Sequence, residues 1–218
     1  MSQTYDEQLN SWLNKEKLAI NTLKSVGSLM YEKGIELILF RRHLLEIGAS
    51  ELMNFISYAN NVVGRENNIE TINILSEEML KMNLAPCKVD IGLLTAEFIE
   101  SNSSNANKFL LNKLSHIIDK KNAPRKAKDV ILYGFGRIGR LAARELIKQA
   151  GKGQQLRLKA IVVRNLSNEQ IIKRADLLRT DSVHGAFKGV VDVDLNNQSI
   201  IVNGQKIKFI NGNQPANI

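Results

Sequence analysis

Cysteine and long hydrophobic runs are what this 218-residue chain has least of. Its one cysteine, Cys87, cannot form a disulfide within the chain, which is usual for a protein of a reducing compartment. A transmembrane helix needs about 20 consecutive apolar residues, and the sequence has no such run. Residues 1–7 are polar and acidic, which excludes a secretory signal peptide. We therefore expect a cytoplasmic protein with no membrane partner.

Clusters of metal ligands are also missing. The three histidines, His43, His116 and His184, are scattered, and none has a second ligand at a useful spacing, so we expect no metal site. Cys87 lies in the segment A-P-C-K-V within an apolar region that we expect to be helical. We expect this thiol to be buried and unreactive, because a nucleophilic cysteine needs an exposed, electropositive setting.

The charge of the chain is distributed unevenly. Residues 1–122 contain 13 Lys or Arg and 15 Asp or Glu, whereas residues 123–218 contain 17 and 7. The basic surplus of the second part favours polyanions, either a phosphate-rich cofactor or nucleic acid. A solvated basic surface that binds neither is an equally simple explanation.

Residues 1–122 are predicted to form an all-α N-terminal domain. Apolar residues recur near one face of the first helix, namely Leu9, Trp12, Leu13, Ile20, Leu23, Gly27 and Met30. Further apolar helical stretches are 35–47, 52–63, 69–82, 89–99 and 109–118. Gly34, Gly48 and Gly64 stand where C-terminal helix caps are expected.

The polar, basic segment 119–128 contains a proline and is predicted to be a linker. Strands are then predicted at 130–133 and 156–163, each followed by a helix, at 137–150 and 168–178. Three further strands, 189–194, 199–202 and 206–210, follow without helices between them. Asn203-Gly204 is a strong signal for a type I′ turn, so the last two strands should form a β-hairpin.

The segment V-I-L-Y-G-F-G-R-I-G at 130–139 has the pattern of a dinucleotide-binding turn. In such a turn Gly134 makes the tight bend, Gly136 lets the backbone approach a pyrophosphate, and Gly139 lets the helix pack closely on the strand. Backbone N–H groups of Gly136, Arg137 and Ile138 at the helix start would hold the anion. A glycine-rich turn that binds nothing is the alternative.

Two separated motifs carry a resemblance to a known family. The segment from Gly134 to Arg140 reads G-F-G-R-I-G-R, and Asp181 begins the segment D-S-V-H-G. Together they resemble phosphorylating glyceraldehyde-3-phosphate dehydrogenase, over residues 129–218. The resemblance implies an α/β fold in which 123–218 is the N-terminal part of a Rossmann NAD(P)-binding domain. The segment before it resembles the helical N-terminal extension of a long bacterial form.

Several residues depart from the family pattern. Tyr133 replaces an asparagine before the first glycine. Where NAD-using members have an aspartate after the second strand, this chain has Leu166, preceded by Arg164 and Asn165. We expect Arg164 and Asn165 to face the adenosine ribose. An arginine accepts a 2′-phosphate that an aspartate would repel, so the cofactor is NAD or NADP, with NADP tolerated.

The resemblance implies the oxidative phosphorylation of an aldehyde, as in glycolysis or gluconeogenesis, by a homo-oligomer in the full-length form. The family's catalytic cysteine segment, S-C-T-T-N, does not occur in this sequence. We therefore expect the chain to be a truncated cofactor-binding part with no catalytic residues and no turnover alone. Two alternatives remain, a nucleic-acid-binding module and a regulatory module that docks a partner. Nucleic acid is not expected, because no recognisable reader motif is present.

Overall fold

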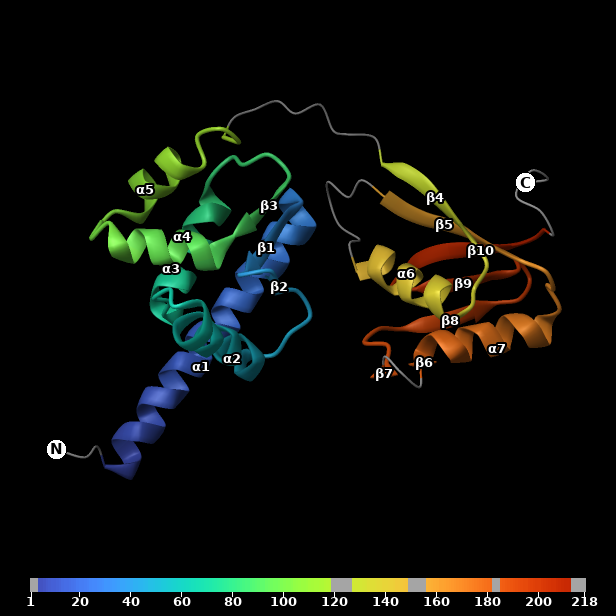
Figure 1. Ribbon diagram of the computed structural model, residues 1–218, viewed down its shortest axis with the longest axis horizontal. Helices are drawn as coiled ribbons and strands as arrows, with labels where there is room; N and C mark the ends of the chain where they lie inside the picture. Colours follow the sequence, from blue (N-terminus) through green and yellow to red (C-terminus); the bar gives the residue numbers. More distant parts are fainter. Residues whose placement is uncertain (1–3, 119–126, 149–155, 182–184, 213–218) are drawn as a thin grey trace. The chain divides into compact units, whose positions relative to one another are not determined.

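A computed structural model describes residues 4–118, 127–148, 156–181 and 185–212 (Figure 1). Contacts divide the chain into two compact units, and the division falls within residues 119–126, outside the described residues. Most of the predicted linker and the predicted domain boundary after residue 122 lie in that segment, so both stay predictions. None of the described helices is long and apolar enough to cross a bilayer.

The N-terminal unit is mostly helical, as predicted. Its α-helices are α1 (Tyr5–Ser28), α2 (Ala49–Tyr58), α3 (Ile69–Lys81), α4 (Ile91–Glu100) and α5 (Ala106–Lys113). Helices α1 and α2 each continue into one wider turn, η1 (Leu29–Lys33) and η2 (Ala59–Val63). Gly34 and Gly64 end these turns with φ of 70° and 69°, the left-handed conformation that glycine adopts without steric cost. Both predicted caps are therefore confirmed.

The expectation of an all-α N-terminal domain is wrong in detail, because this unit also contains a small sheet. Residues 35–47, predicted as a helix, form β1 (Ile35–Leu39) and β2 (Arg42–His43), and β3 (Cys87–Asp90) precedes α4. Strand β1 lies between β2 and β3 and is parallel to β3. Burial in β1 alternates residue by residue, the period of a strand. Its partner lies about 50 residues away, so a local pattern does not reveal it.

Gly48 is a further correction. It is the N-cap of α2, with φ of −89°, rather than the C-terminal cap of a preceding helix. The physical reason is that β2 and a turn, rather than a helix, precede it. Gly48 supplies no side-chain oxygen, so α2 begins without a side-chain cap.

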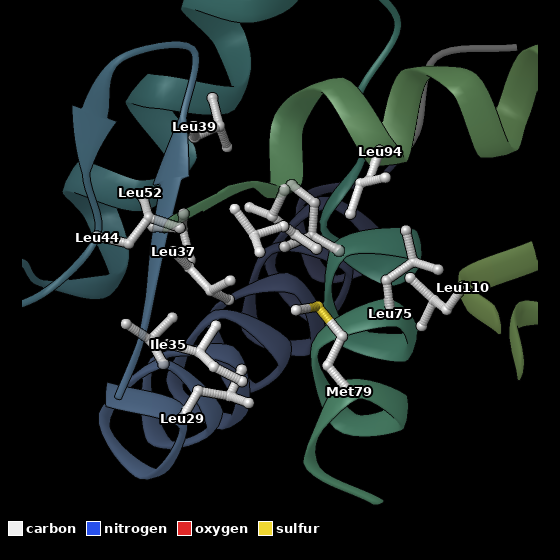
Figure 2. Packing of buried hydrophobic residues seen from close by; sticks show 14 of the residues in the cluster. Leu29, Ile35, Leu37, Leu39, Leu44, Leu52, Leu75, Met79, Leu94 and Leu110 are labelled. Atoms are coloured by element: carbon white, nitrogen blue, oxygen red, sulfur yellow. The ribbon is translucent and has the colours of Figure 1, made fainter. Parts of the chain in front are cut away.

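Apolar side chains, mostly leucine and isoleucine, from α1, η1, β1, α2, α3 and the later helices fill one hydrophobic core (Figure 2). Leu29, Ile35 and Leu75 are completely buried there. Two polar links join α1 and η1 to α3. The hydroxyl of Thr22 donates to Asn73 Oδ1 at 3.3 Å, and the Lys33 ammonium donates to the carbonyl oxygens of Leu80 and Met82, where α3 ends.

The first half of α1 takes no part in that core. Every residue from 4 to 15 is exposed, and Figure 1 shows this end of α1 extending beyond the other elements of its unit. The predicted apolar face is therefore not a core face over most of its length. The buried residues of α1 are instead Ala19, Thr22, Ser25 and Val26, which lie on another side of the helix.

The C-terminal unit begins with the two predicted strand–helix pairs. These are β4 (Lys128–Tyr133) with α6 (Arg137–Lys148), and β5 (Leu156–Val163) with α7 (Asn168–Arg179). The later strands are β6 (Thr180–Asp181), β7 (Gly185–Ala186), β8 (Val191–Asp194), β9 (Ser199–Val202) and β10 (Gln205–Asn211). The main sheet has the order β4-β5-β10-β9-β8, in which β4, β5 and β10 are parallel and β8, β9 and β10 form antiparallel hairpins. This mixed α/β architecture confirms the predicted fold of the unit.

The predicted hairpin turn is confirmed as well. Asn203 and Gly204 have φ of 47° and 79°, and the two positive values are those of a type I′ turn. The turn brings β10 beside β9, and β10 then pairs with β5, so that Phe209 lies opposite Ile161. Both side chains belong to the second core, which α6 and α7 cover together with the sheet.

Candidate functional site

The glycine turn follows β4 directly. Gly134 has φ of +90°, a value that side chains rarely allow, and its N–H donates to the carbonyl oxygen of Val162 on β5 at 2.9 Å. The turn therefore leaves the sheet at once and begins α6 three residues later. A residue with a Cβ in place of Gly134 would strain the backbone there.

Gly136 and Gly139 differ in what surrounds them. A Cβ added to Gly139 would lie 2.4 Å from the carbonyl oxygen of Gly134, so only glycine lets α6 pack this closely on the turn. A Cβ added to Gly136 would meet no atom within 4 Å. The space beside Gly136 is open, as a backbone that must approach a ligand requires.

Helix α6 begins at the open side of this turn. The first bond of the helix joins Arg140 N–H to the carbonyl oxygen of Gly136 at 2.9 Å. The N–H groups before it have no acceptor within a helix, and the helix dipole adds partial positive charge at the same end. Arg137 is exposed, and Ile138 has 84% of its surface exposed. An anion can therefore reach these N–H groups.

Arg164 and Asn165 follow the neighbouring strand. Because β4 and β5 are parallel and Tyr133 lies opposite Val162, both strands end at the same edge of the sheet as the glycine turn. Arg164 is exposed and has no hydrogen bond or ion pair within the described ranges. Asn165 shapes the bend before α7, since its Oδ1 accepts from Ser167 N–H at 2.9 Å. Two groups of residues predicted from separate parts of the sequence thus lie at one sheet edge.

Two nearby residues add information that the sequence pattern did not supply. Leu166, at the position of the family's aspartate, packs against the second core and is not a polar group of the site. Arg174 on α7 donates to the carbonyl oxygen of Asn165 at 2.9 Å, which places a second cation at the residue that follows Arg164. The sequence could have indicated Arg174, because this residue lies about two helical turns after Ser167, the N-cap of α7.

The arginines of α6 connect the two sequence motifs. Arg140 forms an ion pair with Asp181, the first residue of the second motif. Arg144 donates to the carbonyl oxygens of Leu178, shortly before that motif, and of Gly185, its last residue, at 2.7 and 3.0 Å. Residues 182–184, including His184, lie outside the described residues. The arginines thus have a structural role that sequence analysis did not assign to them.

Cys87 has the surroundings of an unreactive thiol. It begins the strand β3, so the expected helical setting is wrong, and it is partly rather than fully buried where it packs against the first core. This burial raises the pKa of its thiol, so that less thiolate forms near neutral pH. Across the described ranges, no group of three or more His, Cys, Asp or Glu side chains is arranged to hold a metal ion.

Comparison with known protein families gives one match over the C-terminal unit. Residues 128–218 match the family model described as glyceraldehyde 3-phosphate dehydrogenase, NAD binding domain. The matched segment starts at the first residue of β4 and includes the glycine turn, Arg164 and the β-hairpins.

Individual relatives agree with this match. A protein of Pseudomonas aeruginosa named glyceraldehyde-3-phosphate dehydrogenase-like protein is 44% identical over 151 residues, which are 68% of this chain and 32% of that protein. Glyceraldehyde-3-phosphate dehydrogenases of Monascus purpureus and Bacteroides fragilis are 41% and 38% identical, each over 87 residues, 40% of this chain. Those segments are 23% and 24% of the two enzymes. The chain thus spans about a third or a quarter of the length of these relatives.

The lengths of the matches indicate which of these relatives is also similar to the N-terminal unit. Stretches of 87 residues are no longer than the 128–218 segment, whereas the 151-residue match exceeds that segment. The similarity to the Pseudomonas protein must therefore include part of the N-terminal unit. Part of that unit is therefore shared with at least one relative.

Proposed function

Because residues 128–218 belong to the NAD-binding domain of the glyceraldehyde-3-phosphate dehydrogenase family, we propose that the glycine turn and the end of β5 hold the two halves of the dinucleotide. The backbone of Gly136, Arg137 and Ile138 binds the pyrophosphate. Arg164 and Asn165 contact the adenosine ribose. The observation that carries the proposal is the open space beside Gly136, next to the exposed first turn of α6.

The residues present suit such a ligand. A pyrophosphate needs N–H donors and a close backbone approach, and the start of α6 offers both without a side chain in the way. Gly139 holds the helix against the turn, which fixes the direction of these N–H groups. A bound nicotinamide ring would accept or donate a hydride, and this chain's own contribution is to bind and orient the cofactor.

Tolerance of NADP is the finer part of the proposal. The first carboxylate in sequence after β5 is Glu169, so no acidic residue stands where an aspartate would accept the ribose hydroxyl and repel a 2′-phosphate. Arg164 is exposed, and Arg174 is anchored beside it on Asn165. Two guanidinium groups at the end of β5 favour a phosphate over a bare hydroxyl.

For the whole protein we propose the phosphorylating oxidation of an aldehyde, with glyceraldehyde 3-phosphate as the substrate that the family name gives. A cysteine thiolate would add to the aldehyde carbon, a hydride would pass from that carbon to the oxidised nicotinamide cofactor, and phosphate would displace the thiolate to release the acyl group as an acyl phosphate. Cys87 is not proposed as this nucleophile, because it packs against the first core and its pKa is raised.

Titration calorimetry of the 218-residue chain with NAD and with NADP tests cofactor binding. Gly136→Val should weaken both cofactors at least tenfold, since a branched side chain would occupy the open space that the pyrophosphate needs. Gly27→Val is the matched control, because Gly27 is on α1 and a Cβ there also meets no atom within 4 Å. Equal binding by the parent and Gly136→Val would remove the glycine turn from the site.

A further inference from the structure

The exposed first half of α1 is a segment of helix that nothing in its own unit covers. It extends over residues 4–15, and at about 1.5 Å per residue this is roughly 18 Å of helix. A capping box at Thr4 and Glu7 begins the helix. Helices of this length are marginal in water, and most of their stability in proteins comes from packing of an apolar face. The segment therefore forms a helix, although it lacks the packing of an apolar face that normally stabilises one.

An apolar stripe runs along this exposed segment and one turn beyond it. The exposed fractions are 78% for Tyr5, 41% for Leu9, 44% for Trp12, 49% for Leu13 and 57% for Ile20. At about 100° per residue, these five side chains fall within roughly a third of the helix circumference. One charged residue, the partly buried Glu16, falls within the same arc, between Leu13 and Ile20 along the chain. Because Ala19, Thr22, Ser25 and Val26 bury a different side of α1 in the core, these five apolar side chains remain exposed.

We propose that this stripe is the contact surface for a second copy of the chain, with the two α1 helices antiparallel. In a two-fold contact, each residue meets a partner residue such that their numbers add to a constant. A sum near 25 places Tyr5 opposite Ile20 of the partner subunit and Trp12 opposite Leu13 of the partner subunit. The middle and both ends of the stripe then contact apolar side chains, whereas Leu9 lies opposite Glu16 of the partner subunit.

Charges beside the stripe support this arrangement. Asp6 and Lys17 lie on the same flank of the stripe, about 20° apart around the helix, and neither forms an ion pair in the part of its chain that is described. Antiparallel pairing brings Asp6 beside Lys17 of the partner subunit, and symmetry repeats the contact. In a parallel pair this flank would meet the opposite flank of the partner helix, so Asp6 and Lys17 would lie on opposite sides of the contact and could not pair. The stripe and its flank are therefore self-complementary in one orientation.

Trp12 is the single tryptophan of the chain and lies at the centre of the proposed contact, so its fluorescence reports on it. The full chain should sediment as a dimer at high concentration. On dilution the dimer should dissociate, and Trp12 emission should shift to longer wavelength over the same concentration range. A monomer at every concentration would overturn the proposal, whether its emission is red-shifted or blue-shifted. The blue-shifted case would mean that the stripe packs against its own chain.

Substitutions locate the contact. Leu13→Glu should weaken dimerisation at least tenfold, whereas Ile74→Glu should leave it unchanged, because Ile74 on α3 is exposed to a similar extent (51%) outside the stripe. Dimerisation that is unchanged in Leu13→Glu would place the dimer interface elsewhere and contradict the proposal.

The orientation is tested by exchanging charges. Asp6→Lys alone and Lys17→Asp alone should each weaken the dimer, and the double variant Asp6→Lys/Lys17→Asp should restore most of the loss. If each substitution acted only by weakening the α1 helix, the two losses would add in the double variant instead of cancelling. Circular dichroism measures the helix content of each variant. Failure of the double variant to recover would rule out the antiparallel pairing.

Discussion

Nη2 of Arg140 lies 3.1 Å from Oδ2 of Asp181, and the two side chains are only 12% and 7% exposed. Arg140 belongs to the first turns of α6, directly after the glycine turn, whereas Asp181 lies in β6, 41 residues later. The ion pair thus joins the two sequence motifs on which the family resemblance rests. In this chain the ion pair therefore fixes the start of α6 against β6.

Replacement of Arg140 by Met should lower the stability of the C-terminal unit. The change removes a charge-assisted hydrogen bond in a largely buried setting, for which about 1.5–3 kcal/mol is typical. Urea unfolding followed by circular dichroism would measure the loss. Arg137→Met is the control, since Arg137 is exposed on the same helix. Equal stability of the two variants would show that the ion pair does not support the turn.

Gly139→Ala should destabilise the fold, whereas Gly136→Ala should not. The added Cβ at Gly139 would lie 2.4 Å from a backbone oxygen, and relief requires movement of the helix or the turn. Overpacking of this kind costs about 1–3 kcal/mol. Thermal unfolding of both variants gives the comparison, and similar melting temperatures would contradict the close packing of α6 on the turn.

Arg164→Ala should weaken NADP binding by about 1.5–3 kcal/mol, or roughly tenfold to a hundredfold, and leave NAD binding almost unchanged. The lost group is a cation beside the proposed 2′-phosphate position. Arg157→Ala is a matched control, because Arg157 is an exposed arginine near the other end of β5. Calorimetry with both cofactors would exclude Arg164 from the site if the two affinities fell equally or not at all.

Alkylation of Cys87 should be slower in the folded chain than in urea. Burial raises the pKa of this thiol, so a smaller fraction is thiolate at pH 8, and the surrounding core limits access. The alkylation rate of the unfolded chain should level off once its thiol is fully ionised. The alkylation rate of the folded chain should continue to rise at higher pH, because its thiol has the higher pKa. A stopped-time maleimide assay at several pH values measures both rates, and a faster reaction in the folded state would indicate an activated thiol.

The 218-residue chain should show no oxidation of glyceraldehyde 3-phosphate in the presence of phosphate and either cofactor. Catalysis needs a nucleophile, a base and the cofactor held together, and Cys87 lacks the activating neighbours of a nucleophile. Absorbance at the wavelength of the reduced nicotinamide gives the readout. Turnover that disappears in Cys87→Ser would make Cys87 the nucleophile and reverse this assignment.

The C-terminal unit was predictable because its signals are local. The run ending at Tyr133, the glycine turn and Asn203-Gly204 each specify a conformation within a few residues, and the structure has these features where they were expected. The match to the NAD-binding family confirms the resemblance drawn from the same residues. Ligand contacts of Arg164 and Asn165 stay a prediction, since position at a sheet edge does not establish binding.

The N-terminal unit was less predictable because its decisive contacts are distant. Residues Ile35 to Leu39 are apolar enough to suit a helix, and only pairing with β3, about 50 residues later, makes them a strand. The exposure of the stripe on α1 could not be predicted for a related reason. Periodicity shows that Leu9, Trp12 and Leu13 share a face, but whether a face is buried depends on the rest of the fold.

The bonds from Lys33 to the end of α3, together with the Thr22–Asn73 bond, have a consequence for how the N-terminal unit opens. Neither helix can separate from the other without breaking buried polar contacts, so the second half of α1 and α3 should exchange their amide hydrogens as one cooperative block. Residues 5–15 stand outside that block and should exchange early unless a partner covers them. A single helix would then show two protection regimes, with the border near Ala19.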